Sequence, residues 1–167
     1  MRDFVCKPKK TRKLVLLDIE NLAGSGLVSS TMALQIVKAL NLMCPIELRD
    51  IVFVGSHKGN VEPCSLVARM LHGSMCLQNG PDGAELALLR RAEEVTPAAY
   101  TSEIYPISEC VIGSGDHMFV DHALTQKEQG RSVTVISRSL GLSSKLAAVA
   151  DRIIIIDGLE IEYRKAV

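Results

Sequence analysis

The sequence predicts a single α/β domain, a three-layer sandwich with a central, mainly parallel sheet, and three observations support this fold class. Short apolar runs alternate with helical patterns along the chain, as in proteins whose helices cover both faces of a sheet. The apolar runs are continuous, which is typical of strands buried on both faces. The 167 residues, 47% of them hydrophobic, suffice for one domain with a substantial core.

The first predicted unit is a strand followed by a loop and a helix. The strand covers 14–19, and Gly24 and Gly26 mark the loop after it. We expect a helix over 30–43, because its apolar residues recur on one face, and Pro45 ends it.

The same alternation of strands and helices continues to the end of the chain. The strand runs are rich in aliphatic residues, and Gly, Pro or Asn residues mark most boundaries between elements. In order, we expect a strand at 51–54, a helix at 63–71, a strand at 75–77, a helix at 82–95, a longer connection at 96–108 with room for a short helix, a strand at 110–113, a helix at 117–129, a strand at 133–136, a helix at 143–149 and a strand at 153–156.

The formal charge of the chain is zero, but the charges are unevenly placed. Residues 1–13 form a basic arm ahead of a single domain at 14–167. The bases of this arm are Arg2, Lys7, Lys9, Lys10, Arg12 and Lys13. Clustered cations bind a phosphate backbone with release of counterions, so the arm is a candidate segment for binding such a backbone. A solubilising tail is the alternative interpretation.

The five cysteines are scattered and have no Cys-x-x-Cys spacing, which argues against a disulfide framework or a zinc knuckle. Cys64, His72 and Cys76 could act as ligands, but buried thiols are the simpler interpretation. No apolar run approaches the roughly 20 residues that span a bilayer. Since the first residues also lack the apolar region of a signal peptide, we expect a soluble, cytoplasmic protein without membrane contact.

Two predicted strands run directly into an acidic residue. Asp18 comes directly after the apolar run of the first strand, and Asp116 follows the strand at 110–113 through a turn of small residues. Because an unpaired buried carboxylate is costly, Asp18 is expected to have a partner. Carboxylates at this edge of a sheet suit Mg²⁺ or Mn²⁺, with Asn21 and Ser114 orienting a ligand or a water. Asp116 can instead cap the helix that follows it.

Another pair of acids begins the helix expected at 82–95. Asp82 and Glu85 are three residues apart, as in a capping box, so local physics favours Asp82 as the N-cap. Glu85 lies in the first turn, from where its side chain can reach the same sheet edge as Asp18.

Three blocks of the sequence together resemble the signatures of NYN domains, a branch of the PIN-like nucleases. They are Asp18-x-x-Asn21, Gly83-Ala84-Glu85-Leu86-Ala87-Leu88 and Ser114-Gly115-Asp116-x-x-Phe119, and their order and spacing cover about 14–156. The resemblance implies a metal-dependent ribonuclease with a parallel sheet of strand order near 3-2-1-4-5. It also implies Asp18, Glu85 and Asp116 as catalytic, metal-holding acids, supported by Asn21.

Two positions depart from the pattern of this family. The family usually has Asp where this chain has Glu85, and many members carry a further acid at the position of Met118. Asp121 lies one turn beyond Met118 and could substitute for it, or could be a solvated helix residue. His117 and His122 are candidates for phosphate contact or proton transfer, although such histidines are more often structural or exposed.

The sequence thus predicts an endoribonuclease in which a Mg²⁺ or Mn²⁺ ion activates the attacking water. Its expected partner is RNA, single-stranded rather than duplex. The basic side chains expected to bind it are Lys9, Lys10, Arg12, Lys13, Arg90 and Arg91. Two alternatives stay open: a catalytically weakened RNA- or protein-binding module of the same fold, which Met118 favours, and a small-molecule phosphatase. Whether the chain forms a homodimer is also left open.

Overall fold

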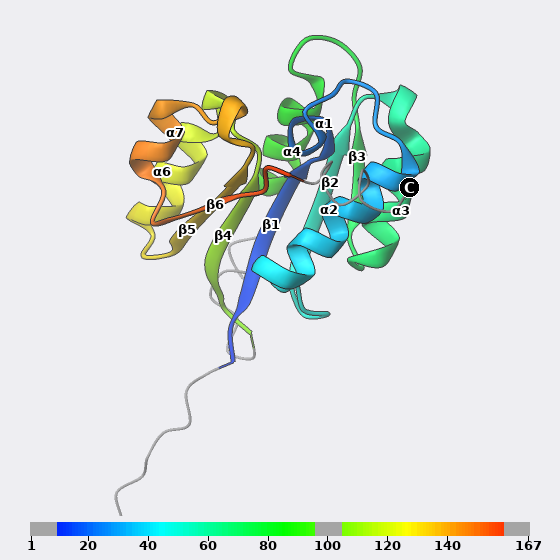
Figure 1. The fold of residues 1–167 in the computed structure, drawn as a ribbon. Helices are drawn as coiled ribbons and strands as arrows, with labels where there is room; N and C mark the ends of the chain where they lie inside the picture. The colour runs from blue at the N-terminus through cyan, green and yellow to red at the C-terminus, as the bar shows by residue number, and fades with distance from the viewer. Residues whose placement is uncertain (1–9, 96–104, 159–167) are drawn as a thin grey trace, which may run out of the picture.

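The computed structural model of the protein describes residues 10–95 and 105–158. Its centre is a six-stranded sheet in which every pair of neighbouring strands is parallel, in the order β3-β2-β1-β4-β5-β6 (Figure 1). The strands are β1 (Arg12–Asp18), β2 (Ile51–Ser56), β3 (Ser74–Leu77), β4 (Ile107–Gly113), β5 (Ser132–Ser137) and β6 (Arg152–Ile155). The predicted fold class is confirmed, and the first five strands have the expected order.

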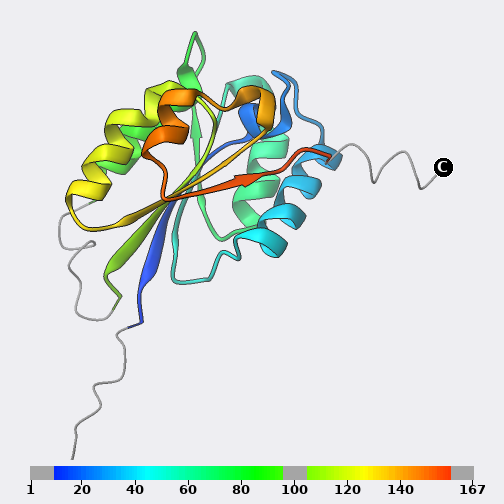
Figure 2. The same ribbon diagram turned by 60° about the vertical axis from the view of Figure 1, so that its left-hand side comes forward.

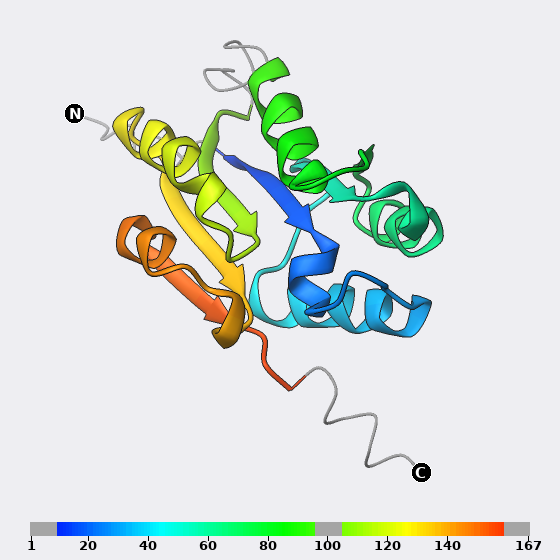
Figure 3. The ribbon, with the colours of Figure 1, turned by 90° about the horizontal axis from the view of Figure 1, so that it is seen from above.

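Helices cover both faces of this sheet (Figure 3). One layer consists of α1 (Ile19–Ala23), α2 (Ser30–Met43) and α3 (Val61–Met70). The other consists of α4 (Gly83–Glu94), α6 (Val120–Glu128) and α7 (Ser144–Val149). In the described part of the chain, three short 3-10 helices lie in loops, namely η1 (Lys58–Asn60), η2 (His117–Phe119) and η3 (Ser139–Gly141).

Successive residues of β1 pack into opposite layers of the sandwich. Val15 and Leu17 belong to the core cluster under α1, α2 and α3, whereas Leu14 and Leu16 belong to the cluster under α4, α6 and α7. All four side chains are fully buried, which explains the continuous apolar run in the sequence. Each such side chain contributes on the order of 2 kcal/mol to folding.

Most element boundaries agree with the prediction. The helix α2 has the bounds expected, and the Oγ of Ser29 caps it by accepting a hydrogen bond from the N–H of Met32 (3.1 Å). The helix expected at 117–129 is divided into η2 and α6. The short α1 was not predicted, because its five residues are too few to show a helical period.

The boundary placed after residue 13 needs correction, because β1 already begins at Arg12. Lys13 is held at the amino end of this strand, where its Nζ donates to Pro45 O (2.9 Å) and lies 3.5 Å from Asp50 Oδ2. This is the opposite end of β1 from Asp18. Lys9 lies outside the described residues, as does most of the connection at 96–108 with its expected short helix.

The strand order reverses between β1 and β4, and this places the candidate site. From β1 the sheet continues to β2 and β3, and from β4 it continues to β5 and β6, which lies at the edge (Figure 2). Leu17 pairs with Gly113 in the parallel register, so Asp18 and Ser114 leave the sheet on neighbouring strands. Parallel α/β sheets bind ligands at such a reversal, beyond the carboxyl ends of the strands.

Within the described ranges, no helix is both long enough and apolar enough to cross a membrane. Cys44, Cys64, Cys76 and Cys110 are buried free thiols, in agreement with the simpler interpretation of the sequence.

Candidate functional site

Asp18 is the last residue of β1 and the N-cap of α1. Its Oδ1 accepts hydrogen bonds from the backbone N–H groups of Glu20 (3.1 Å) and Asn21 (3.2 Å), and the residue is only 2% exposed. The end of β1 and the first turn of α1 therefore hold this buried carboxylate in place, and the helix supplies two backbone donors.

Glu85 brings a second carboxylate to Asp18 from the first turn of α4. The pKa of Asp18 is raised to about 8, first by burial, then by the negative charge of Glu85, and further by a hydrogen bond between the two side chains. The N–H of Asn21 acts in the opposite direction and stabilises the ionised form. A buried carboxylate and a half-buried one that repel each other are a place where a cation gains binding energy.

The path of the chain into α4 fixes where Glu85 lies. Asp82 adopts a left-handed conformation with φ of 54°, and its side chain makes no capping hydrogen bond. The predicted capping box is therefore wrong, because this backbone conformation turns Asp82 away from the N-cap geometry. Gly83 comes next, and a Cβ there would lie 2.5 Å from Gln78 O, so only glycine allows the helix to start this close to the β3 loop.

The carboxylate pair lies in a pocket with a volume of about 550 Å³. Residues from the ends of β1 and β5, from α1 and the loop after it, and from the start of α4 form its wall. They are Asp18, Glu20, Asn21, Gly24, Ser25, Gly26, Glu85, Arg138, Leu140 and Gly141. Asp18, Asn21 and Glu85 were predicted for the site, whereas Glu20 and Arg138 were not.

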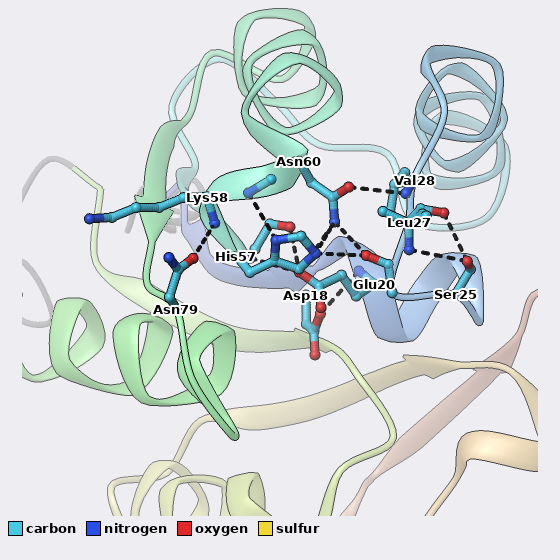
Figure 4. Close-up of polar contacts among 12 residues, drawn as sticks. Asp18, Glu20, Ser25, Leu27, Val28, His57, Lys58, Asn60 and Asn79 are labelled. Atoms are coloured by element: carbon cyan, nitrogen blue, oxygen red, sulfur yellow. Dashed lines mark hydrogen bonds and ion pairs between the residues drawn. The ribbon is translucent and has the colours of Figure 1, made fainter.

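Glu20 connects the pocket wall to β2 through a group of hydrogen bonds (Figure 4). Its Oε1 accepts from the Oγ of Ser56 (2.6 Å), from the N–H of His57 (2.7 Å) and from the Nδ2 of Asn60 (3.4 Å). These donors hold one oxygen of Glu20 in place, and the charge of Glu20 adds to the rise in the pKa of Asp18.

The loop after α1 is fastened to β2 and η1 by two further side chains (Figure 4). Asn60, which is 2% exposed, accepts from the N–H of Val28 (3.1 Å) and donates to Gly26 O (3.0 Å). The Nδ1 of His57 accepts from the N–H of Gly59 (2.9 Å), so the neutral ring carries its proton on Nε2, which lies 2.8 Å from Gly26 O. The wall of the pocket is thus held in place by hydrogen bonds within the protein.

Asn21 connects α1 to the turn after β4. Its Oδ1 accepts from the N–H of Gly115 (2.9 Å), while Gly115 O accepts from the N–H of Ser143 (2.8 Å). A Cβ on Gly115 would lie 2.1 Å from Gly141 O, so the backbones of these two glycines are in close contact. Asn21 therefore acts by joining the structural elements around the pocket.

Asp116 takes the capping role that the sequence left open. Its Oδ1 accepts from the N–H of Met118 (2.8 Å) and lies 3.2 Å from His117 Nδ1. Ser114 is buried, and its Oγ accepts from the N–H of Asp116 (3.2 Å). Neither Asp116 nor Ser114 is among the residues that line the pocket.

The other candidates also lie away from the pocket wall. Asp121 is exposed on α6, and His122 packs with its Nε2 3.6 Å from Cys110 Sγ. Burial lowers the pKa of His122 to about 4, which does not suit a general acid or base at neutral pH. Arg90 bonds to a glutamine on the β3 loop, and Arg91 pairs with a glutamate one turn further along α4.

The predicted metal site can be tested against these positions. In residues 10–95 and 105–158, no three or more His, Cys, Asp or Glu side chains form a group that could hold a metal ion. The expected set of three acids is therefore not assembled, and Cys64, His72 and Cys76 form no such group. The Asp18–Glu85 pair by itself fits Mg²⁺ or Mn²⁺, ions that proteins often hold with one or two carboxylates plus waters.

Two pocket residues were missed, although the sequence carried a signal for each. Glu20 lies two residues after Asp18, in the segment that we expected to be a strand end and loop. Arg138 comes directly after β5, so the rule that placed Asp18 at the carboxyl edge would have placed Arg138 there too.

Comparisons with known proteins agree with the fold. No family model matches this chain, and no curated protein matches it. The chain is similar to the crystal structure of a protein of unknown function from Vibrio parahaemolyticus, with a TM-score of 0.61 and 16% sequence identity over 93% of this chain and 98% of that one. At this level of identity the likeness concerns the fold alone.

Proposed function

We propose that the protein is an endoribonuclease that depends on Mg²⁺ or Mn²⁺ and acts in the pocket at the carboxyl edge of the sheet. The observation that carries the proposal is the pairing of the buried Asp18 with the half-buried Glu85, whose negative charge adds to the burial that raises the pKa of Asp18 to about 8. Structural ion pairs lower the pKa of an acid, whereas this pair is two acids and the pKa of Asp18 is raised. A divalent cation would relieve the repulsion.

In this proposal, Asp18 and Glu85 hold the ion. When bound there, such an ion would supply an activated water and would stabilise the charge that develops on the phosphate. Asp18 is oriented by the N–H groups of α1, and Glu85 by the start of α4. Glu20 adds a negative charge to the same wall of the pocket. Hydrogen-bond donors from β2 and from the residue after it hold one of its carboxylate oxygens in place. Asn21 keeps α1 in place against the turn after β4.

The test is cleavage of mixed single- and double-stranded RNA by the purified chain with Mg²⁺, Mn²⁺ or a chelator. We expect cleavage with metal alone, and a loss of more than about 100-fold in Asp18→Asn and in Glu85→Gln. Asn is a good N-cap, so Asp18→Asn keeps the cap of α1. The matched control is Glu62→Gln, an exposed acid in the first turn of α3.

Calorimetric titration with Mn²⁺ separates a lost ligand from a lost catalytic group. Asp18→Asn should lose Mn²⁺ binding in step with cleavage, while Glu62→Gln keeps both. A parent protein that binds no Mn²⁺ in the millimolar range, or an Asp18→Asn variant that cuts RNA at the parental rate, would contradict the proposal.

A second candidate is an RNA- or protein-binding module that has lost catalysis. Two observations favour it: a group of three or more metal-binding side chains is missing among the described residues, and Met118 stands where an acid is common in the resembled family. Under this alternative the parent binds RNA without cutting it, with or without metal. Hydrolysis of an aryl phosphate without activity on RNA would instead favour a phosphatase.

A further inference from the structure

Two side chains on the pocket wall have no part in the function proposed above. Arg138 and Leu140 both come from the segment after β5, on either side of Ser139, and both line the pocket. Asp18 and Glu85 belong to the part of the wall formed by β1 and α4. The pocket therefore combines an acidic part with a separate part that carries a guanidinium and an apolar side chain.

Arg138 is held against the end of α1. Its Nη1 donates to Ala23 O (2.9 Å), and the guanidinium lies over Gly24, where a Cβ would be 2.8 Å from Nε. Gly24 has φ of 66°, so glycine serves both the turn and the close approach of the arginine.

Leu140 is fully exposed, although it lies in a well-fixed turn. The N–H of Gly141 donates to Arg138 O (3.2 Å), and the N–H of Ser139 donates to Asp157 Oδ1 (2.9 Å). The contact of Gly141 with Gly115 fixes the other end of η3. Leu140 is therefore held at the wall of the pocket with its side chain accessible to a ligand that enters there.

We propose that Arg138 and Leu140 form a nucleotide-binding wall, in which Arg138 binds a phosphate of a single-stranded nucleic acid and Leu140 packs against the sugar and the unpaired base next to it. The inference rests on the proposed function and names the class of its substrate. A guanidinium matches two phosphate oxygens with parallel hydrogen bonds. An unpaired base exposes its flat apolar face to Leu140, whereas stacking covers that face in a duplex.

The experiment measures fluorescence anisotropy of a short labelled oligouridylate and of an RNA duplex of the same length. All variants are made in the full chain with Asp18→Asn and measured with Mg²⁺, so that cleavage does not interfere. We expect Arg138→Gln to weaken oligouridylate binding about tenfold and to lower the slope of log affinity against log salt by about one. Arg138→Lys should restore the slope, because it restores the charge.

Leu140→Ala is expected to weaken binding of the oligouridylate about three- to tenfold, a smaller loss than for an aromatic platform, with no change for the duplex. Two matched controls lie away from the pocket wall. Arg152→Gln replaces an arginine that, like Arg138, donates to a backbone carbonyl, here that of Met43 (3.1 Å). Leu48→Ala replaces a leucine that is 77% exposed. Both controls should bind like the background protein.

The outcomes separate this inference from the proposed function. If the parent cuts RNA but Arg138→Gln and Leu140→Ala bind oligouridylate as tightly as the Asp18→Asn background protein does, the nucleotide-binding wall is disproved and the proposed nuclease activity is not. A protein partner is then the better candidate to bind at the rim of the pocket. If the variants lose binding as expected but the parent never cuts RNA, the wall stands and the nuclease fails. Equal losses for duplex and single strand in Leu140→Ala would overturn the assignment to unpaired bases.

Discussion

The ends of β1 and β4 look alike in sequence but differ in what they do. Each is an apolar strand that leads to an acid at the reversal of strand order, and the two strands are neighbours in the sheet. Asp18 is buried against Glu85, and repulsion adds to the burial that raises its pKa. Asp116 is partly exposed, and its side chain caps η2.

The difference comes from the segment that each strand leads into. Helix α1 begins immediately after Asp18, so its carboxylate stays within the sheet edge and meets α4. Two residues separate the end of β4 from Asp116, and the turn that they form moves the acid away from the pocket. An acid at the end of a strand is therefore a site candidate only when the next element keeps it over the sheet.

The largest expected effect concerns the pH dependence of stability in metal-free protein. The pKa of Asp18 is higher in the folded state, at about 8, than its ordinary value of 3.8, so its contribution to stability is complete below about pH 4 and is lost as pH rises through 8. Chemical unfolding should show a loss of up to about 5 kcal/mol over this window. Asp18→Asn should remove most of this dependence.

Asp116→Asn is the matched comparison at the end of β4, because Asp116 does not line the pocket, and its pH profile is measured beside that of Asp18→Asn. Added Mg²⁺ should restore stability to the parent at pH 8, because it binds only the folded pair. An identical pH slope in the parent and in Asp18→Asn would remove the contrast between the two strand ends.

A second prediction concerns the close packing after β4. Gly115→Ala places a Cβ 2.1 Å from Gly141 O and 2.5 Å from Ser137 Oγ, so backbone must move, and we expect a loss of about 3 kcal/mol in the free energy of unfolding. Gly26→Ala in the loop after α1 is the control, since its Cβ would meet nothing within 4 Å. Similar urea midpoints for the two variants would disprove the close packing of Gly115 against Gly141.

The third prediction concerns His122, whose contribution to stability changes with pH in the opposite direction to that of Asp18. Burial against β4 lowers the pKa of His122 from 6.5 to about 4, so its contribution is present above about pH 6.5 and is lost as pH falls through 4. Relative to the parent, His122→Gln should gain up to about 3 kcal/mol between pH 7 and pH 4. Urea unfolding at both pH values measures this difference, and equal losses on acidification in the parent and the variant would argue against a neutral ring in the folded state.

The smallest effect is expected for the cap at the end of β4. Asp116→Ala removes the acceptor for the N–H of Met118, which should cost about 1 kcal/mol in thermal or urea unfolding. If metal binding by the Asp18–Glu85 pair is unaffected in this variant, the role of Asp116 is confined to capping. A loss of Mn²⁺ affinity as large as in Asp18→Asn would make Asp116 a ligand after all.

Features that depend on interactions between residues near in sequence were predicted, whereas features that depend on residues far apart in the chain were mostly not. Periodicity located α2 to the residue, and the apolar runs located the strands, because burial acts directly on these patterns. The pairing of Asp18 with Glu85 followed from the carboxyl-edge rule and from the resemblance to a family. The capping box failed because the left-handed backbone of Asp82 depends on the β3 loop.

The hydrogen bonds around Glu20 could not have been predicted, since they join residues that are far apart in the chain. Asn60 is 40 positions from Glu20, and nothing local marks it as a partner. Arg138 is 115 positions from the carbonyl that it contacts. Contacts of this kind depend on the completed fold.

Asn60 gives the pocket a further property. Because this buried amide already fixes Gly26 and Val28, the rim of the pocket is preorganised, and an incoming ligand has little backbone entropy to remove. Amide hydrogens of the rim should therefore exchange slowly with solvent in the free protein. Asn60→Ala would convert a rigid receptor into one that orders on association, which lowers affinity without removing any group that touches the ligand.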